Sequence, residues 1–494
     1  MRSPTHSASV EGPTLAPLAA LAIAGVIGAL VCACWSPASC HLEVVARAVP
    51  WRVVGYISAA LLTAVAARAC GLGKVVKYVV LRLMPHSLRL EACLKHAGKK
   101  AGVRDPRTLL DDGTLAAAEE VLRCFRGEAG LTQQGCVHAH AMVTDGLATV
   151  LTMVKDRETA AGKAILRGNI ERPVFTAGPN RSGTTYLHRL LAQHDDFMGP
   201  RFFELIGHPV RPQGLSQFEH DKQRLKAAKG VLSMVGMLMP EVKFLHEAGP
   251  SEVEEDTSPG LAFQSSYCYP CFFEVPSFTP WLGTEAASTG HQVAYSLHRN
   301  FMQHLQFHAK QREIEGGLGG GGGGGPRPGE APLSAPSAGG AAASAASAAK
   351  RERRWMNKSP FHMLTLEKLF AEYPDATVVQ THRPARDIIV SWFHLITVEH
   401  QGWLGRPLTE AERRRKIGRD HLEFMKGMVD ASMRFRRENP GLAGRFVDVR
   451  FEDFVSKPLE TARLVYAALG AEVPLPAGRL TPACGPARTR SPRG

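Results

Sequence analysis

Apolar positions along this chain follow two patterns, short β-branched runs and longer segments with helical spacing. Through residues 85–168, apolar residues recur every three or four positions, which predicts a series of helices. Beyond them, short apolar runs predict strands at 173–177, 376–381 and 446–449. Helical patterns separate these runs, at 183–193, 217–239, 288–312, 361–371, 385–398 and 458–469. Strands separated by helices predict an α/β fold, with a parallel sheet flanked by helices on both faces.

Two segments near the amino terminus are apolar on every side. Residues 14–35 contain no charged side chain, and as a helix they are long enough to cross about 30 Å of hydrocarbon. Residues 53–67 form a second apolar run, which is short for a membrane span on its own. A cleaved signal peptide is the alternative for the first run, but the run is long for one. We predict that residues 1–84 form a membrane-anchoring region with one or two hydrophobic helices.

Residues 316–349 have low complexity, with a Gly run followed by Pro, Ser and Ala. Such a stretch cannot bury enough apolar surface to offset its ordering entropy. Because patterned segments lie on both sides, we expect a disordered insertion within one domain at 169–473. The helical segment at 85–168 precedes this domain, and a Pro-, Arg- and Gly-rich tail at 474–494 is expected to be disordered.

Charge and cysteine content exclude two classes of function. The formal net charge is +13, but the basic residues are spread along the chain without a recognition helix, zinc finger or aromatic single-strand motif. We therefore expect no nucleic acid partner, and mostly solvated basic faces, with attraction of an anionic cofactor or membrane as the other role. Cys268 and Cys271 form a lone Cys-x-x-Cys without a second pair, so we expect no metal.

A Gly-bounded loop between the strand at 173–177 and the next helix carries the first chemical motif. Its sequence is Gly178-Pro179-Asn180-Arg181-Ser182-Gly183-Thr184-Thr185. A strand, loop and helix in this order expose backbone N–H groups to an anion, which predicts a phosphate site. However, Thr184 stands where a nucleotide triphosphatase places its loop lysine, and the positive charge lies at Arg181 instead. The loop is therefore not expected to hold a γ-phosphate and Mg²⁺ in the usual way.

A second anion motif follows the strand at 376–381. Arg383 stands at the end of this strand, and Ser391 lies two helical turns later, so both can reach one oxyanion. Pro384 suits the first turn of the helix between them. Two phosphate sites about 200 residues apart in the chain predict a ligand with phosphates at both ends.

Together these motifs resemble those of sulfotransferases that use 3′-phosphoadenosine 5′-phosphosulfate (PAPS). In that superfamily, a Pro-Lys-Ser-Gly-Thr-Thr loop grips the 5′-phosphosulfate, and the loop here is similar, with one added residue and Arg181 for the lysine. In the same superfamily, an Arg and a Ser eight positions later bind the 3′-phosphate, and Arg383 and Ser391 have this spacing. The resemblance covers roughly residues 170–470 and implies the P-loop NTPase-like sulfotransferase fold.

Two further segments carry this resemblance. Residues 450–470 resemble the late strand and helix of the family. The pattern Trp355-x-x-Lys358-x-Pro360-x-His362 resembles the broad, mostly microbial and algal branch. The resemblance implies that Lys358 lies beside the transferring group. It also implies a set of residues that bind the cofactor, namely Asn180, Arg181, Ser182, Gly183, Thr184, Thr185, Arg383 and Ser391.

The catalytic base stays open between three candidates. Many relatives place a His two residues after the lysine, where this chain has Pro360, so His362 is one candidate. Other sulfotransferases use a glutamate about twenty residues past the phosphate loop, which matches Glu204. The third candidate is an acidic cluster, made of His246, Glu247, Glu252, Glu254 and Glu255.

The implied function is sulfuryl transfer from PAPS to a hydroxyl or amine of an acceptor, such as a glycan, a lipid or a small hydroxylated molecule. A P-loop kinase or nucleotide hydrolase is one alternative, against which Thr184 and the pair of Arg383 and Ser391 count. A catalytically inactive, sulfotransferase-like binding protein is another, suggested by Pro360.

The side of the membrane on which the catalytic part lies stays open. A single anchor would suit a type II enzyme of the Golgi, which is common among membrane-tethered relatives, whereas a two-helix hairpin would return the catalytic part to the side of the amino terminus. The Asn-x-Ser/Thr sequons at Asn180 and Asn357 fall in cofactor-site motifs, where a glycan would interfere. We expect a single- or two-pass membrane protein of the Golgi or another endomembrane.

Overall fold

The computed structural model describes residues 86–238, 241–242, 248–256, 268–318, 353–403, 409–412 and 418–471. All of them belong to one compact unit, Leu81–Gly494. The apolar segments of residues 1–84, the tail and nearly all of the predicted insertion lie outside the described residues, so those predictions stay predictions. Within the described ranges, no helix has both the length and the apolar character needed to span a membrane.

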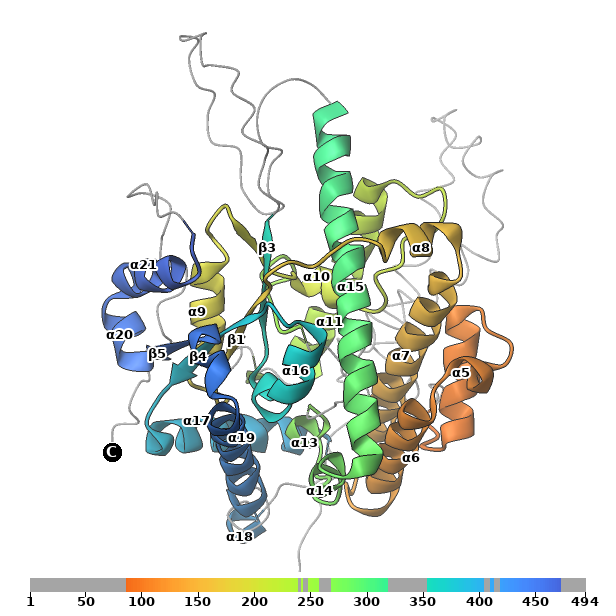
Figure 1. Ribbon diagram of the computed structural model, residues 1–494. Coiled ribbons are helices and arrows are strands. Elements are labelled where there is room, and N and C mark those ends of the chain that lie inside the picture. Colours follow the sequence, from red (N-terminus) through yellow and green to blue (C-terminus); the bar gives the residue numbers. More distant parts are fainter. Residues whose placement is uncertain are drawn as a thin grey trace, which may run out of the picture. The chain divides into compact units, whose positions relative to one another are not determined.

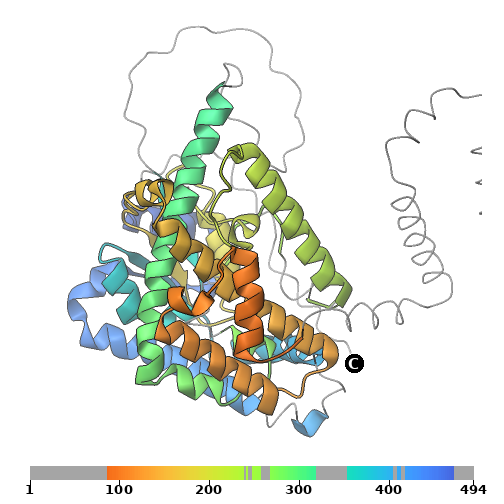
Figure 2. The ribbon, with the colours of Figure 1, turned by 90° about the vertical axis from the view of Figure 1, so that its right-hand side faces the viewer.

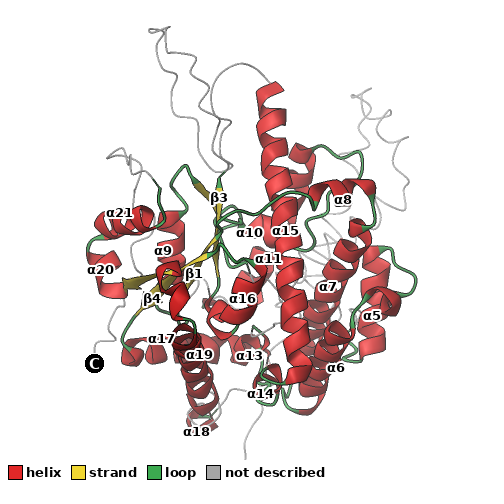
Figure 3. Cartoon of the chain, viewed as in Figure 1, coloured by secondary structure: helices red, strands yellow, loops and turns green. Residues whose placement is uncertain are grey.

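The centre of this unit is a sheet of five parallel strands (Figures 1 and 3). In spatial order they are β2 (Phe197–Met198), β3 (Arg354–Lys358), β1 (Val174–Ala177), β4 (Thr377–His382) and β5 (Phe446–Arg450). The predicted parallel sheet is confirmed, and so are three of its strands within a residue. Strands β2 and β3 were not predicted.

Both faces of the sheet are buried, as the mixing of strands and helices predicts. Alternate residues of β1 enter different cores, Val174 on one face and Phe175 on the other. The first face is covered by α9 (Thr184–Leu191), α20 (Phe451–Ser456) and α21 (Pro458–Ala468). On the second face the core is larger and takes in helices from three parts of the chain, α15 (Glu285–Leu318), α16 (Leu366–Glu372) and α19 (Arg419–Glu438).

The helices that precede the sheet share this second core. They are α5 (Leu90–Ala101), α6 (Asp112–Gly127) and α7 (Gln133–Arg157), and the short helix α8 (Ala160–Ile165) follows them and contacts α7 and α15. In Figure 1, α15 stands between them and the sheet, and in Figure 2, α5, α6 and α7 face the viewer. Local signals start α6 and α7, because the side chains of Asp111 and Thr132 accept hydrogen bonds from backbone N–H groups of their first turns. The predicted helical segment is therefore an integral layer of the unit.

The remaining elements connect these layers. They are the helices α10 (Phe202–Leu205), α11 (Gln217–Leu238), α13 (Tyr269–Phe272), α14 (Phe278–Leu282), α17 (Ala385–Trp403) and α18 (Glu410–Glu412), and the 3₁₀ helices η1 (Pro106–Leu109), η2 (Pro360–Leu364) and η4 (Pro440–Arg445). Two predictions need correction. The single helix expected at 361–371 is η2 followed by α16, and α15 continues to Leu318, into the first residues of the predicted insertion.

Candidate functional site

The predicted anion motifs lie together at the carboxyl edge of the sheet. Strand β1 has β3 on one side and β4 on the other, and the chain leaves all three strands at this edge. The register pairs Thr176 of β1 with Lys358 of β3, and Ala177 with Gln380 of β4. Ligands of open α/β sheets bind at such an edge, where neighbouring connections diverge.

The loop at 178–183 has a geometry that needs its glycines. Gly183 has φ +87°, and a Cβ there would lie 2.5 Å from Phe454 Cζ. A Cβ on Gly178 would lie 2.0 Å from Thr381 Oγ1. Gly183 is the N-cap of α9 and has no side chain to cap it, so the first amides of this helix remain available to an anion. Ser182 fixes the loop to β4, since its Oγ lies 2.6 Å from Thr381 Oγ1.

Two arginines from the two motifs converge beside this loop. Arg181 has a left-handed backbone, with φ +67°, which is uncommon outside glycine. Its Nε donates to Ser391 Oγ at 3.0 Å, and Arg383 donates to the Arg181 carbonyl at 2.8 Å. Arg383 also lies 4.1 Å over the ring of Phe451. The loop motif and the Arg383/Ser391 motif, about 200 residues apart in the sequence, thus form one surface.

The electrostatics of this surface favour an anion. Burial and the neighbouring charge of Arg383 both lower the pKa of Arg181. Two buried polar atoms, Arg383 Nε and Asn180 Nδ2, have no hydrogen-bond partner in the part of the chain that the structure describes. An anion between these groups would satisfy the donors and offset the repulsion of the two guanidinium groups.

Lys358 ends strand β3 and is fully buried. Its Nζ donates to Thr185 Oγ1 at 3.0 Å and to Glu255 Oε1 at 2.6 Å, and it lies 3.5 Å from Glu254 Oε1. A buried ammonium needs such partners, because its desolvation is otherwise costly. The structure therefore brings together Lys358, the phosphate loop and the acidic cluster.

Glu204 contacts other groups. It is 3% exposed, and its carboxylate lies 3.0 Å from Arg201 and 2.7 Å from Arg312 of α15. Burial acts to raise the pKa of Glu204, but the charges of Arg201 and Arg312 lower it overall. Glu204 is thus held ionised between two arginines, which is a structural role. These contacts weaken the case for Glu204 as a base.

His362 lies in η2 and is 2% exposed. Its Nδ1 lies 2.8 Å from the Tyr295 hydroxyl, and its Nε2 lies 3.1 Å from both carboxylate oxygens of Asp256. With both ring nitrogens engaged, His362 has no free nitrogen for an acceptor proton. Sequence reasoning missed Asp256, although it continues the acidic run after Glu255.

The rest of the acidic cluster contributes less. His246 and Glu247 lie outside the described residues, and Glu252 lies 3.9 Å from Arg189. Within the described ranges, no group of three or more His, Cys, Asp or Glu side chains is arranged to hold a metal ion.

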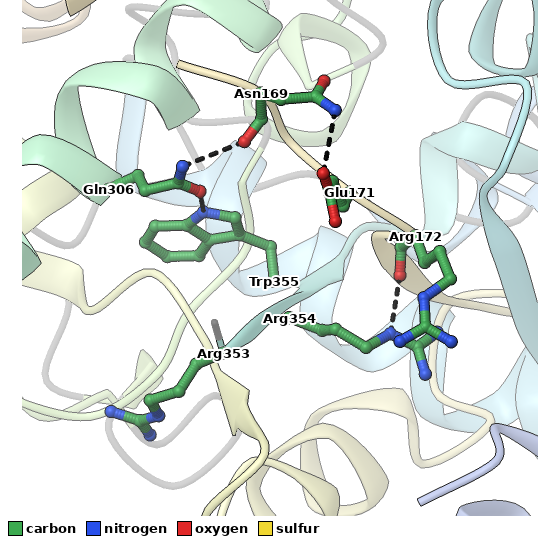
Figure 4. Close-up of a pocket in the computed structure, with 7 residues that line it drawn as sticks. All are labelled: Asn169, Glu171, Arg172, Gln306, Arg353, Arg354 and Trp355. Atoms are coloured by element: carbon green, nitrogen blue, oxygen red, sulfur yellow. Dashed lines mark hydrogen bonds between the residues drawn. The ribbon is translucent and has the colours of Figure 1, made fainter. Parts of the chain in front are cut away.

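A small polar hollow lies near the opposite end of β3 (Figure 4). It is lined by Asn169, Glu171, Arg172, Gln306, Arg353, Arg354 and Trp355. Its volume of about 30 Å³ has room for water but not for a nucleotide. Gln306 closes one wall by bonding both Trp355 and Asn169. Because the hollow lies at the start of β3 and Lys358 lies at its end, the hollow is separate from the phosphate loop.

Known proteins share the sequence pattern and the fold of this chain. A profile of the Sulfotransferase family matches residues 173–474. The fold is similar to that of sulfotransferase STF1 from Mycobacterium tuberculosis, with 23% identity over 78% of this chain and 90% of that one and a TM-score of 0.56. It is also similar to sulfotransferase STF9 from Mycobacterium avium, with 17% identity over 77% of this chain and 83% of that one and a TM-score of 0.57. No curated protein sequence matches the chain significantly. Because the profile spans more than half of the chain, this protein belongs to the sulfotransferase family of enzymes.

Proposed function

We propose that this enzyme transfers a sulfuryl group from PAPS to a hydroxyl or amine of its acceptor. The observation that carries the proposal is the convergence of Arg181, Arg383 and Ser391 beside a phosphate loop whose first helical turn contacts Lys358. A ligand with phosphates at its 5′ and 3′ positions would occupy both parts of this surface.

Each anionic group of PAPS then has its own partners. The amides from Ser182 to Thr185 and the guanidinium of Arg181 would bind the 5′-phosphosulfate. Arg383 and Ser391 would bind the 3′-phosphate. Phe451 supports this arrangement by holding the Arg383 guanidinium in place.

Lys358 supplies positive charge where the leaving group forms. The bond between sulfur and the bridging oxygen breaks as the acceptor oxygen binds sulfur, so negative charge moves onto the 5′-phosphate. The Lys358 ammonium, next to Thr185 at the start of α9, is placed to stabilise that charge. To contact the cofactor, Lys358 would give up part of its hydrogen bonding to Glu255.

We propose Glu255 as the base. Its side chain is 28% exposed, whereas the carboxylate of Glu204 is clamped and both nitrogens of His362 are engaged. Glu255 also lies 2.6 Å from Lys358, so an acceptor beside the sulfuryl group would be within its reach. The acceptor proton passes to Glu255, and the products are the sulfated acceptor and 3′-phosphoadenosine 5′-phosphate (PAP).

The acceptor class follows from the predicted anchor. If residues 14–35 hold the enzyme in a Golgi or other endomembrane, glycans and lipids at that membrane are favoured over small hydroxylated molecules that diffuse freely. Transfer of radiolabelled sulfate from PAPS to a membrane extract, followed by identification of the labelled product, tests this part.

Calorimetric titration with PAP and with ATP plus Mg²⁺ tests the cofactor. We expect PAP to bind at least tenfold more tightly, since only PAP has a 3′-phosphate for Arg383 and Ser391. Tighter binding of ATP would favour a P-loop kinase. Binding of PAP without any label transfer would favour the inactive binding protein.

A further inference from the structure

A chain of buried polar groups lies behind Lys358, with Asp256 at its centre. Its carboxylate lies 3.1 Å from His362 Nε2 and 3.2 Å from His298 Nε2. The second nitrogen of each histidine meets a tyrosine hydroxyl, at Tyr295 for His362 and at Tyr373 for His298, at distances of 2.8 and 2.7 Å. The order is therefore tyrosine, histidine, aspartate, histidine, tyrosine.

This Asp256 network joins elements that are far apart in the sequence. His298 and Tyr295 come from α15, His362 from η2, and Tyr373 from the end of α16. Asp256 itself directly follows Glu255, and its backbone N–H donates to the Lys358 carbonyl at 3.2 Å. The network thus holds both the acidic segment and the end of β3.

Burial makes this arrangement rigid. Asp256 is fully buried, and His362 and His298 are 2% and 4% exposed. Burial acts to raise the pKa of Asp256, but the charge of His362 and the hydrogen bonds from both histidines lower it overall. A buried carboxylate with these partners has one favourable position, because any shift leaves a charge or a donor without its partner.

We propose that Asp256 is a positioning residue for sulfuryl transfer, which fixes Glu255 and Lys358 relative to the phosphate loop. This inference rests on the proposed function. Asp256 is too buried to meet a substrate, so it acts through its neighbours. Since Glu255 is adjacent in the chain and Lys358 is bonded through its carbonyl, small movements of Asp256 change the distance between base and lysine.

The test compares Asp256→Asn with Asp156→Asn. Asp156 of α7 also lies close to a histidine, with its carboxylate 3.2 Å from His304 Nε2 and 12% of its side chain exposed, away from the phosphate loop. We expect Asp256→Asn to lower kcat by about 100-fold, with PAP affinity within about threefold of wild type, because misplacing catalytic groups costs rate rather than cofactor binding. Asp156→Asn should keep the wild-type kcat, although it lowers stability.

A double variant separates positioning from general stabilisation. In a Glu255→Gln background, adding Asp256→Asn should lower kcat by about 10-fold or less instead of about 100-fold, because the part of its effect that acts through Glu255 is already lost and only the part through Lys358 remains. Independent, multiplicative losses would overturn the proposal, and so would a wild-type kcat in Asp256→Asn. All rates are measured as radiolabel transfer from PAPS to a membrane extract.

Two further outcomes are distinguishable. If the wild-type enzyme binds no PAP and transfers no label, the proposed function fails, and the inference fails with it. If Asp256→Asn does not fold, Tyr373→Phe removes the outer partner of His298 while keeping Asp256. We then expect kcat to fall by about 3- to 10-fold at unchanged PAP affinity, and an unchanged kcat would overturn the inference.

Discussion

At the scale of single residues, the site depends on positive charges that are held close together and are partly or fully buried. Arg181 adopts a left-handed backbone next to Arg383, an arrangement that costs conformational and electrostatic free energy without an anion. Lys358 is buried between Thr185 and Glu255. Strain and concentrated charge of this kind are typical of binding sites, because the ligand supplies the compensation.

Arg383→Ala should weaken PAP binding by about 10- to 150-fold, because a hydrogen bond to a charged group contributes about 1.5–3 kcal/mol. Binding of 5′-AMP, which lacks the 3′-phosphate, should change little. Arg386→Ala is the matched control, since Arg386 lies three residues after Arg383, in the first turn of α17, and its side chain is 87% exposed. Calorimetry measures all three proteins, and equal losses for both ligands would place Arg383 away from the 3′-phosphate.

Glu255→Gln should lower turnover by about 100- to 10,000-fold, because the amide cannot take the acceptor proton. PAP affinity should stay close to that of wild type. The same assay on Glu204→Gln and His362→Ala ranks the other candidates, for which we expect smaller losses. A normal rate for Glu255→Gln together with an inactive Glu204→Gln would return the role to Glu204.

Glu204→Gln should lower the free energy of unfolding by about 3 kcal/mol at neutral pH, since it leaves two arginines near an uncharged amide. The folded state lowers the pKa of Glu204, so its contribution is complete above the ordinary value of 4.5 and is lost as pH falls below it. Urea unfolding of both proteins should therefore show a difference that shrinks with acidification. A difference in the free energy of unfolding that stays constant with pH would contradict a stabilising role for the ion pairs of Glu204.

At the scale of elements, β3 shows what a single strand can contribute. Its sequence, Arg-Trp-Met-Asn-Lys, contains no β-branched residue, so local propensity did not predict it. Pairing with β1 on one side and β2 on the other nevertheless makes it an interior strand, and it delivers Lys358 to the edge of the sheet at which we propose that PAPS binds.

Deleting residues 320–349 and joining the ends with a short flexible linker should preserve the fold and PAP affinity. Helix α15 ends at Leu318 and β3 begins at Arg354, so the deletion leaves both elements complete. Loop-closure entropy changes slowly with length, and the free energy of unfolding should change by about 1 kcal/mol or less. Circular dichroism and PAP titration check this, and an unfolded product would mean that the segment packs.

At the scale of the whole molecule, the helices α5, α6 and α7 and the sheet share one hydrophobic core. Residues such as Val121 and Leu147 are fully buried in it, together with Phe301 of α15. The catalytic unit is therefore larger than the part that resembles sulfotransferases in sequence.

A chain that begins at residue 86 should consequently fold and bind PAP, whereas one that begins at residue 169 should aggregate. The shorter chain exposes the apolar face of α15, and each fully buried large side chain contributes about 1.5–3 kcal/mol. Size-exclusion chromatography and PAP calorimetry distinguish the two. A well-folded chain from residue 169 would show that α5–α8 are dispensable.

The sequence alone determined the features that depend on neighbouring residues. The phosphate loop follows from Gly178, Gly183 and the helix after them, and the alternation of strands and helices predicts the parallel sheet. Arg383 and Ser391 also form a local motif, because one helix connects them. These features can be read from the chain because short-range geometry determines them.

Only the tertiary structure decided which charges meet. Glu255 with Lys358, Glu204 with Arg312, and Asp256 with two histidines are contacts between segments far apart in the chain. Sequence spacing favoured Glu204 and His362 as bases, but burial and ion pairing engage both, and the partner of Lys358 is Glu255. The pKa and availability of a carboxylate depend on the groups that folding brings around it, which no local pattern contains.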